Sequence, residues 1–149
     1  MHHPTTVRGV IEDLFKTQCV GVLATQSEQY PYCNLVAFTP DADLTSLLFA
    51  TPRATQKYRN LTLSRSVAFL VDNRSEVGAD FAAGVAVTAL GTICEAPPEQ
   101  DTVLRQRHCS RHTALTDFIL NPDCALLVMQ VDIYIVVRGV AETAVFPMR

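Results

Sequence analysis

A helical pattern of hydrophobic residues lies near the start of the chain. Between residues 5 and 17, apolar side chains recur at spacings of three and four residues, at Val7, Val10, Ile11, Leu14 and Phe15. This spacing puts them on one face of an α-helix. The segment is therefore predicted to be an amphipathic helix that packs against a sheet or a barrel.

Most of the other hydrophobic positions fall in short, β-branched runs separated by polar turns. Such runs predict strands at residues 19–26, 30–40, 46–50, 67–72, 85–96, 124–132 and 133–142. Gly91, inside the fifth run, suggests a bulge or bend. Several runs are apolar on both faces, which would leave exterior surface that needs a partner.

Two helical regions interrupt the strands. One is predicted after the third strand, and the other between Pro97 and Pro122, with a break near Ser110. Because strands and helices do not alternate strictly, a doubly wound parallel fold is the weaker interpretation. The pattern predicts a mainly β chain, a closed or split β-barrel of six to seven antiparallel strands with helices, forming one domain over residues 1–149.

The stretch FATPRATQKYRNL, residues 49–61, joins the third strand to the helix that follows it. Thr51 is the predicted N-cap, with Pro52 in the first helical position, and the helix would run to about Ser64. With this start, Arg53 and Lys57 would share one side of the helix.

The same junction has the composition of an anion site. A helix N-terminus offers unpaired N–H groups, and the Thr51 and Thr55 hydroxyls with the Arg53 and Lys57 charges would complete a phosphate cradle. An ordinary capped, solvated helix start would contain the same residues, so both interpretations stay open at this point.

Composition narrows the class of ligand. The 149 residues are 48% hydrophobic and carry a net charge of −3, with Lys and Arg scattered along the chain. This distribution argues against nucleic-acid binding and favours a small neutral or anionic ligand. No apolar run is long enough to span a bilayer or to form a signal peptide, so we expect no membrane association and a cytoplasmic location.

Cysteine and histidine residues raise one competing chemistry. Five cysteines without a C-x-x-C pair predict reduced, mostly buried thiols rather than a disulfide framework. His108 and His112 are four residues apart with Cys109 between them, so a helix could present both imidazoles to a metal or a haem iron. No zinc or haem-attachment motif accompanies them, and a short basic helix at a surface has the same spacing.

Several segments taken together resemble a known family. They are GVLATQSEQYPYCNLVAF (21–38), FATPRATQKYRNL (49–61), VAFLVDNR (67–74), VAVTALGTICE (85–95) and HTALTDFILNPDCALLVMQVDIYIVV (112–137). In order and spacing they resemble the pyridoxamine 5′-phosphate oxidase-like superfamily, the FMN-binding split-barrel proteins. The resemblance implies a split barrel that forms a homodimer and binds FMN in grooves at the subunit interface.

The resemblance also implies which residues bind the cofactor. The phosphate site falls on Thr51, Arg53, Thr55 and Lys57, and the strand beside the flavin ring on Asn34, Leu35, Val36, Ala37 and Phe38. Ala50 is a further cofactor-binding position. Asn73, Arg74, Ser75 and Thr88 are second-rank positions that would face the same flavin or the partner's. No metal site is implied.

The chain departs from the family pattern in two places. Gln56 stands where the oxidases proper have an arginine before the phosphate-binding lysine, so Arg53 would have to supply that charge. The chain ends AVFPMR, without the arginine and histidine of the C-terminal arm that grips the vitamin substrate. The sequence therefore argues against vitamin B6 oxidation.

Three functions fit these residues. The favoured one is an FMN-dependent oxidoreductase that passes a hydride or electrons between a nicotinamide, NADH or NADPH, and an unidentified small molecule. The alternatives are a non-catalytic FMN-binding or electron-transfer protein and a haem-binding variant of the same barrel. A deazaflavin would present the same phosphate as FMN, and no side chain stands out as a catalytic acid or base.

Overall fold

The computed structural model describes residues 6–74 and 83–149. Its helices are α1 (Val7–Thr17), α2 (Gln56–Leu63), α4 (Pro98–Arg111), the 3₁₀ turn η1 (Thr113–Leu115) and α5 (Thr116–Leu120). Its strands are β1 (Val20–Gln26), β2 (Pro31–Ala37), β3 (Thr39–Pro40), β4 (Ser46–Pro52), β5 (Ser66–Asp72), β6 (Val85–Glu95), β7 (Cys124–Arg138) and β8 (Glu142–Pro147).

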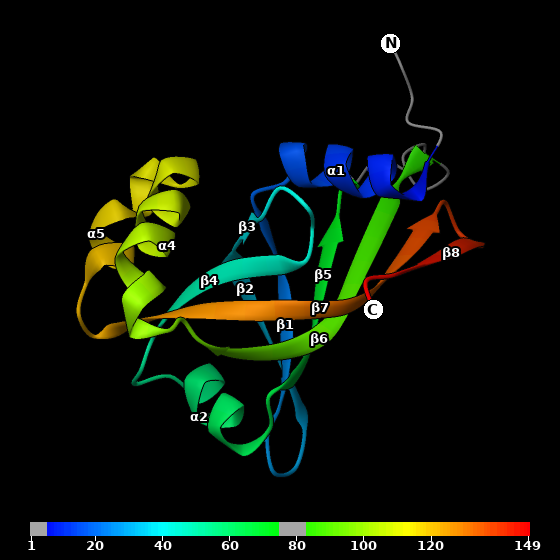
Figure 1. Cartoon of the computed structure of the whole chain (residues 1–149). Helices are drawn as coiled ribbons and strands as arrows, with labels where there is room; N and C mark the ends of the chain where they lie inside the picture. Colours follow the sequence, from blue (N-terminus) through cyan, green and yellow to red (C-terminus); the bar gives the residue numbers. More distant parts are fainter. Residues whose placement is uncertain (1–5, 75–82) are drawn as a thin grey trace.

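The eight strands form one sheet in which every pairing is antiparallel. The order is β2-β1-β5-β6-β7-β4-β3, and β8 pairs with β7. Figure 1 shows the sheet curling into a half-barrel, with α1 along one side and α4 and α5 together at one end. The predicted mainly β, antiparallel split-barrel fold is confirmed.

Helix α1 closes the concave side of the sheet with its apolar stripe, as predicted. Thr6 caps the helix by accepting a hydrogen bond from the Gly9 N–H. The buried Phe15 ring lies 5.1 Å from that of Phe38 and 6.0 Å from that of Tyr134, edge to face in both pairs. Edge-to-face packing of this kind adds to the burial of apolar surface that holds the helix on the sheet.

The last two predicted strands are one continuous strand, β7, and β8 follows it as an additional strand. The β6–β7 register skips Asp132, because Leu90 pairs with Ile133 and Gly91 with Val131. The bulge predicted at Gly91 is therefore confirmed. A Cβ at Gly91 would lie 1.9 Å from the Gln130 carbonyl oxygen, so only glycine fits this close approach.

The predicted start of the second helix is wrong by four residues. Strand β4 continues through Pro52, which pairs with Cys124, and the Arg53 N–H donates to the Asp123 carbonyl. The helix begins at Gln56, and its N-cap is Thr55, whose hydroxyl oxygen accepts from the Tyr58 N–H. Pairing with β7 thus holds Thr51 and Pro52 in an extended conformation, so the helix cannot begin at these residues.

Two rows of mostly apolar residues cross six strands on the outer face of the sheet. The paired positions are Leu35, Val22, Leu70, Thr88, Ile135 and Val145 in one row and Cys33, Ala24, Ala68, Leu90, Ile133 and Pro147 in the other. We call these twelve residues the outer face. Leu35 is 77% exposed and Val145 55% exposed, so the described part of this chain leaves the face uncovered.

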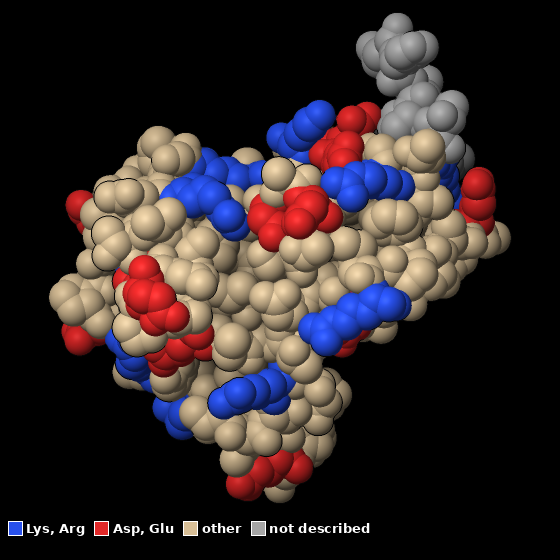
Figure 2. All heavy atoms as spheres, in the orientation of Figure 1, with Lys and Arg blue, Asp and Glu red and all other residues tan. Residues whose placement is uncertain are grey.

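Several thiols lie at the surface of the protein. Three of the five cysteines, Cys19, Cys33 and Cys94, are exposed, so the expectation of mostly buried thiols is wrong, although all five are free. On the face seen in Figure 2, basic and acidic side chains are interspersed rather than gathered by sign. None of the described helices is long and apolar enough to cross a bilayer.

Candidate cofactor site

Lys57 lies in the first turn of α2 and lines a pocket of about 200 Å³. The other lining residues come from β2, β4 and the α4–α5 region and are Leu35, Val36, Ala37, Ala50, His108, Leu115, Phe118 and Ile119. We call this the Lys57 pocket. Of the nine described residues that line it, seven are apolar and none is a carboxylate.

The Lys57 ammonium group is half-buried, with no hydrogen bond or ion pair to any residue in the described ranges. Its removal from water lowers the pKa of Lys57 from the ordinary value, an effect that the nearby Cys124 thiol partly opposes. A cation held this way lacks the partner that buried charges normally have. An anionic group entering the pocket would supply that partner.

His108 contributes the second polar group of the pocket and is only 1% exposed. Its Nδ1 lies 2.7 Å from the Thr39 hydroxyl. Burial, followed by repulsion from His112, Arg111 and Arg107, lowers the pKa of His108 to about 4. The imidazole is therefore neutral at physiological pH.

The two histidines of α4 do not form a pair on the helix surface. His112 is also buried, and its Nε2 donates to the Phe38 carbonyl at 2.7 Å. The two rings pack edge to face with centroids 4.8 Å apart. Over the described ranges, no group of three or more potential ligands comes together to hold a metal ion. The pair anchors α4 to the segment that follows β2.

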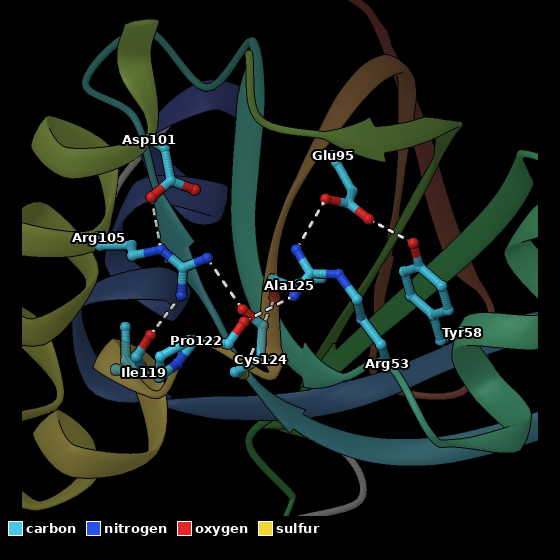
Figure 3. A network of polar contacts seen from close by, with 9 residues as sticks. All are labelled: Arg53, Tyr58, Glu95, Asp101, Arg105, Ile119, Pro122, Cys124 and Ala125. Atoms are coloured by element: carbon cyan, nitrogen blue, oxygen red, sulfur yellow. Dashed lines mark hydrogen bonds and ion pairs between the residues drawn. The ribbon is translucent and has the colours of Figure 1, made fainter. Parts of the chain in front are cut away.

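Arg53 faces a different set of partners from Lys57. It forms an ion pair with Glu95 at 3.1 Å and donates to the Pro122 carbonyl at 2.8 Å, while the Tyr58 hydroxyl donates to the other Glu95 oxygen. Figure 3 shows these contacts, which we call the Arg53 cluster. The expectation that Arg53 and Lys57 share one side is wrong, because Arg53 lies in the turn before the helix.

A second arginine holds the wall of the Lys57 pocket in place. Arg105 of α4 pairs with Asp101 at 2.6 Å and donates to the carbonyls of Ile119 at 2.6 Å and Cys124 at 2.9 Å (Figure 3). These bonds tie α4 to the end of α5 and to the start of β7. They position Ile119, which is fully buried, against Ala50 and the pocket.

The threonines of the junction are engaged within the protein. Thr51 is fully buried, and its hydroxyl lies 3.3 Å from that of Thr55. The Thr55 hydroxyl donates to the Pro52 carbonyl and caps α2. Neither residue lines the Lys57 pocket, whereas Ala50, just before them, does.

The predicted ring-contact strand is divided between pocket and core. Leu35, Val36 and Ala37 line the pocket. Asn34 does not, but its side-chain oxygen is buried without a hydrogen-bond partner among the described residues. Phe38 packs in the core, its N–H donates to the Cys19 carbonyl, and its own carbonyl accepts from His112.

The second-rank residues lie elsewhere. Asn73 and Arg74 follow the end of β5 remote from α2; the Asn73 side chain accepts from the Val85 N–H, and Arg74 pairs with Asp72. Thr88 belongs to the outer face, two strands from Val22. Ser75 lies outside the described residues.

Sequence reasoning missed four residues of the pocket. His108 was weighed only as a metal ligand, and Leu115, Phe118 and Ile119 only as part of a helical region. Their spacing carries no signal for a pocket, because their role depends on how α4 and α5 fold back over β2 and β4.

Comparison with known proteins identifies the family. Residues 8–133 match the family model described as pyridoxamine 5′-phosphate oxidase. The chain belongs to this family. Its sequence has no match among curated proteins.

Solved structures share the fold of this family member at low sequence identity. A haem-binding protein from Mycobacterium smegmatis is 18% identical with a TM-score of 0.80, over 99% of this chain and 60% of that one. An FAD-binding protein from Mesorhizobium loti is 15% identical with a TM-score of 0.66, over 83% of this chain and 88% of that one. A protein from Clostridium acetobutylicum related to general stress protein 26 of B. subtilis is 16% identical with a TM-score of 0.71, over 93% and 92%. At these identities the likeness shows the fold alone, and this chain spans about three fifths of the length of the first protein.

Proposed function

We propose that this family member is a flavoprotein that binds FMN and acts as an FMN-dependent oxidoreductase. One observation carries the proposal: the half-buried, unpartnered Lys57 and the strand residues Leu35, Val36 and Ala37 line one pocket. These are the segments to which the family resemblance assigns the flavin phosphate and ring. A phosphate group is the anion that such a lysine lacks.

The residues present fit one end of the cofactor. Pockets that enclose a whole ligand of this kind usually measure about 300–1,000 Å³, and the Lys57 pocket measures about 200 Å³. In the proposed mode the phosphate end enters the pocket, and the ring lies outside it, along the exposed Leu35.

We further propose a homodimer that covers the ring. The outer face is apolar and uncovered, and an apolar surface of this extent on a single chain marks an interaction site. Leu35 belongs both to this face and to the Lys57 pocket, so a second copy docked on the face would border the cofactor. A symmetric pair would create two such sites.

The bound flavin would supply hydride or electron transfer, and the protein would bind, orient and shield it. NADH or NADPH is the proposed donor, and the acceptor is a small molecule. A deazaflavin with the same phosphate would fit the same pocket. The protein's own contribution is the Lys57 charge, the apolar wall of the pocket and the second copy.

Haem is the second candidate ligand, since one similar structure is named a haem-binding protein and His108 carries a ring nitrogen, Nε2, without a partner among the described residues. The absorbance spectrum of the purified protein separates a flavin from a haem. Anaerobic mixing with NADPH then separates the enzyme, whose flavin would bleach, from a passive flavin carrier, whose flavin would not.

A pair of titrations tests the phosphate position. Lys57→Ala should weaken FMN binding by about tenfold to a hundredfold, because it removes a charge-assisted hydrogen bond. Riboflavin, which lacks the phosphate, should bind both proteins equally. Equal loss for the two flavins, or no loss for either, would overturn the assignment of Lys57 to the phosphate.

A further inference from the structure

One ring nitrogen of His108 is available to a ligand in the Lys57 pocket. Nδ1 is bonded to Thr39, and Nε2, on the opposite side of the ring, has no hydrogen-bond partner among the described residues. Nε2 is also not fully enclosed, so it keeps some accessible surface. Since His108 lines the pocket and is otherwise buried, its accessible edge faces that space.

The pocket is short of positive charge for the ligand proposed above. A phosphate monoester carries a charge of about −1.5 to −2 at pH 7 and has three strong acceptor oxygens. Among the described residues, Lys57 is the only cation that lines the pocket, and Arg53 is paired with Glu95 outside it. The phosphate therefore needs at least one more donor.

The other candidate donors are engaged. The Thr51 and Thr55 hydroxyls contact each other, and each also donates to the Pro52 carbonyl. The Thr55 hydroxyl in addition caps α2. The remaining pocket residues are apolar. Among the described lining residues, Lys57 and His108 are the two whose side chains carry a polar group.

We propose that His108 is a second phosphate-binding residue, whose neutral imidazole donates an Nε2–H hydrogen bond to the phosphate end of the flavin. This mode uses the tautomer with the proton on Nε2, in which the Thr39 hydroxyl donates to Nδ1 at 2.7 Å. The reverse tautomer would point a lone pair at the anion. This inference rests on the proposed function, since it names a further residue of the same site.

The surroundings of His108 suit a neutral donor. Arg107 and Arg111 of α4 and the adjoining His112 repel a proton on the ring. Lys57 lines the same pocket, and none of the described residues that line it is a carboxylate that could attract a proton. A neutral donor binds an anion without the cost of burying a second charge in an apolar site. Protonation of the ring is not required for binding.

Three variants test the proposal with FMN and riboflavin as probes. His108→Leu should weaken FMN binding by about tenfold or more, because it removes a hydrogen bond to a charged group. Thr39→Val should weaken it by a smaller factor, because it removes the hydroxyl that bonds to Nδ1 of His108. His108→Gln, whose side-chain amide can reach a position near that of Nε2, should recover part of the affinity. Riboflavin should bind all of them as it binds the wild type, which also reports that each variant is folded.

Nitrogen chemical shifts provide a readout that a merely structural role would not move. In protein labelled with ¹⁵N-histidine, FMN should shift the His108 Nε2 and its proton, whereas riboflavin should not. If His108→Leu fails to fold, the shift and the Thr39→Val titration still decide the question.

The outcomes separate the two proposals. If Lys57→Ala weakens FMN while His108→Leu and Thr39→Val do not, His108 has no phosphate contact and the flavin function stands. If FMN binds but Lys57→Ala has no effect on it, the phosphate does not lie in the Lys57 pocket and this inference falls. If neither flavin binds the wild type, the proposed function falls with it.

Discussion

Two cations of one short segment end in opposite environments. Arg53 lies in the Arg53 cluster, bonded to Glu95 and to the Pro122 carbonyl, and its side chain is 42% exposed. Lys57, four residues later, is half-buried in the Lys57 pocket and has no partner in the described part of the chain. The comparison teaches that a satisfied cation stabilises the fold, whereas an unsatisfied one indicates a place for a ligand.

The largest expected effect is a loss of folding stability in acid, caused by the buried His108 of the Lys57 pocket. Unfolded histidine titrates near 6.5, and burial lowers the pKa of folded His108 to about 4. Above pH 6.5 both states are neutral; between pH 6.5 and 4 only the unfolded state takes up the proton, so stability falls, and below 4 the loss levels off. At about 1.4 kcal/mol per pKa unit the full loss is roughly 3 kcal/mol.

Denaturant titrations at several pH values measure this loss, and His108→Leu is the matched control. The variant should show a flatter profile between pH 6.5 and 4, with a remainder from His112, whose pKa burial also lowers. The Arg53 cluster should lose stability at lower pH than His108. The hydrogen bond from Tyr58 lowers the pKa of Glu95, so the ionised Glu95 stabilises the fold above the ordinary value of 4.5, and this stabilisation is lost as the pH falls below it. A single acid transition starting below 4.5 would contradict the assignment to His108.

The next effect is on ligand affinity and compares the two cations directly. Lys57→Met should weaken FMN by about tenfold to a hundredfold, whereas Arg53→Met should change it by less than about threefold. The difference follows from the partners already held by Arg53. Isothermal titration with FMN at one salt concentration measures both, and an equal loss for the two variants would mean that Arg53 leaves Glu95 to reach the phosphate.

A smaller effect is expected on the stability of the ligand-free protein, and its sign differs between the two regions. Lys57→Met removes an unpaired, half-buried charge and should leave stability unchanged or raise it by up to about 1 kcal/mol. Arg53→Met breaks an exposed ion pair and a bond to a carbonyl, which should lower stability by about 0.5–1 kcal/mol. Thermal melts without flavin compare the two, and a clear destabilisation by Lys57→Met would indicate an internal partner.

The smallest effect concerns the release of Arg53. Glu95→Gln removes the carboxylate charge but keeps the shape of the side chain, so it frees Arg53 from its ion pair. FMN affinity should stay within about twofold of the wild type, because an exposed pair of this kind contributes about 0–1 kcal/mol and its arginine lies outside the pocket. A marked gain in affinity would show that Glu95 holds back a phosphate-binding arginine.

Much of the fold could be predicted from local patterns. The stripe from Val7 to Phe15 specified α1, the β-branched runs specified most strands, and Gly91 marked the bulge, because each depends on neighbours a few residues away. Lys57, Leu35, Val36, Ala37 and Ala50 were predicted as site residues from a family resemblance, and all five line the same pocket.

The sequence by itself determined which segments become strands and helices and which family the chain resembles. Only the tertiary structure decided where α2 begins, because the pairing of β4 with β7 continues through Pro52 and keeps this residue extended. It also decided that Arg53 pairs with Glu95, 42 residues further along the chain, and that His108 reaches the same pocket as Lys57. The first pair meets because β4 and β6 both pair with β7, and the second set because α4 and α5 lie against β4, so no local pattern could specify either.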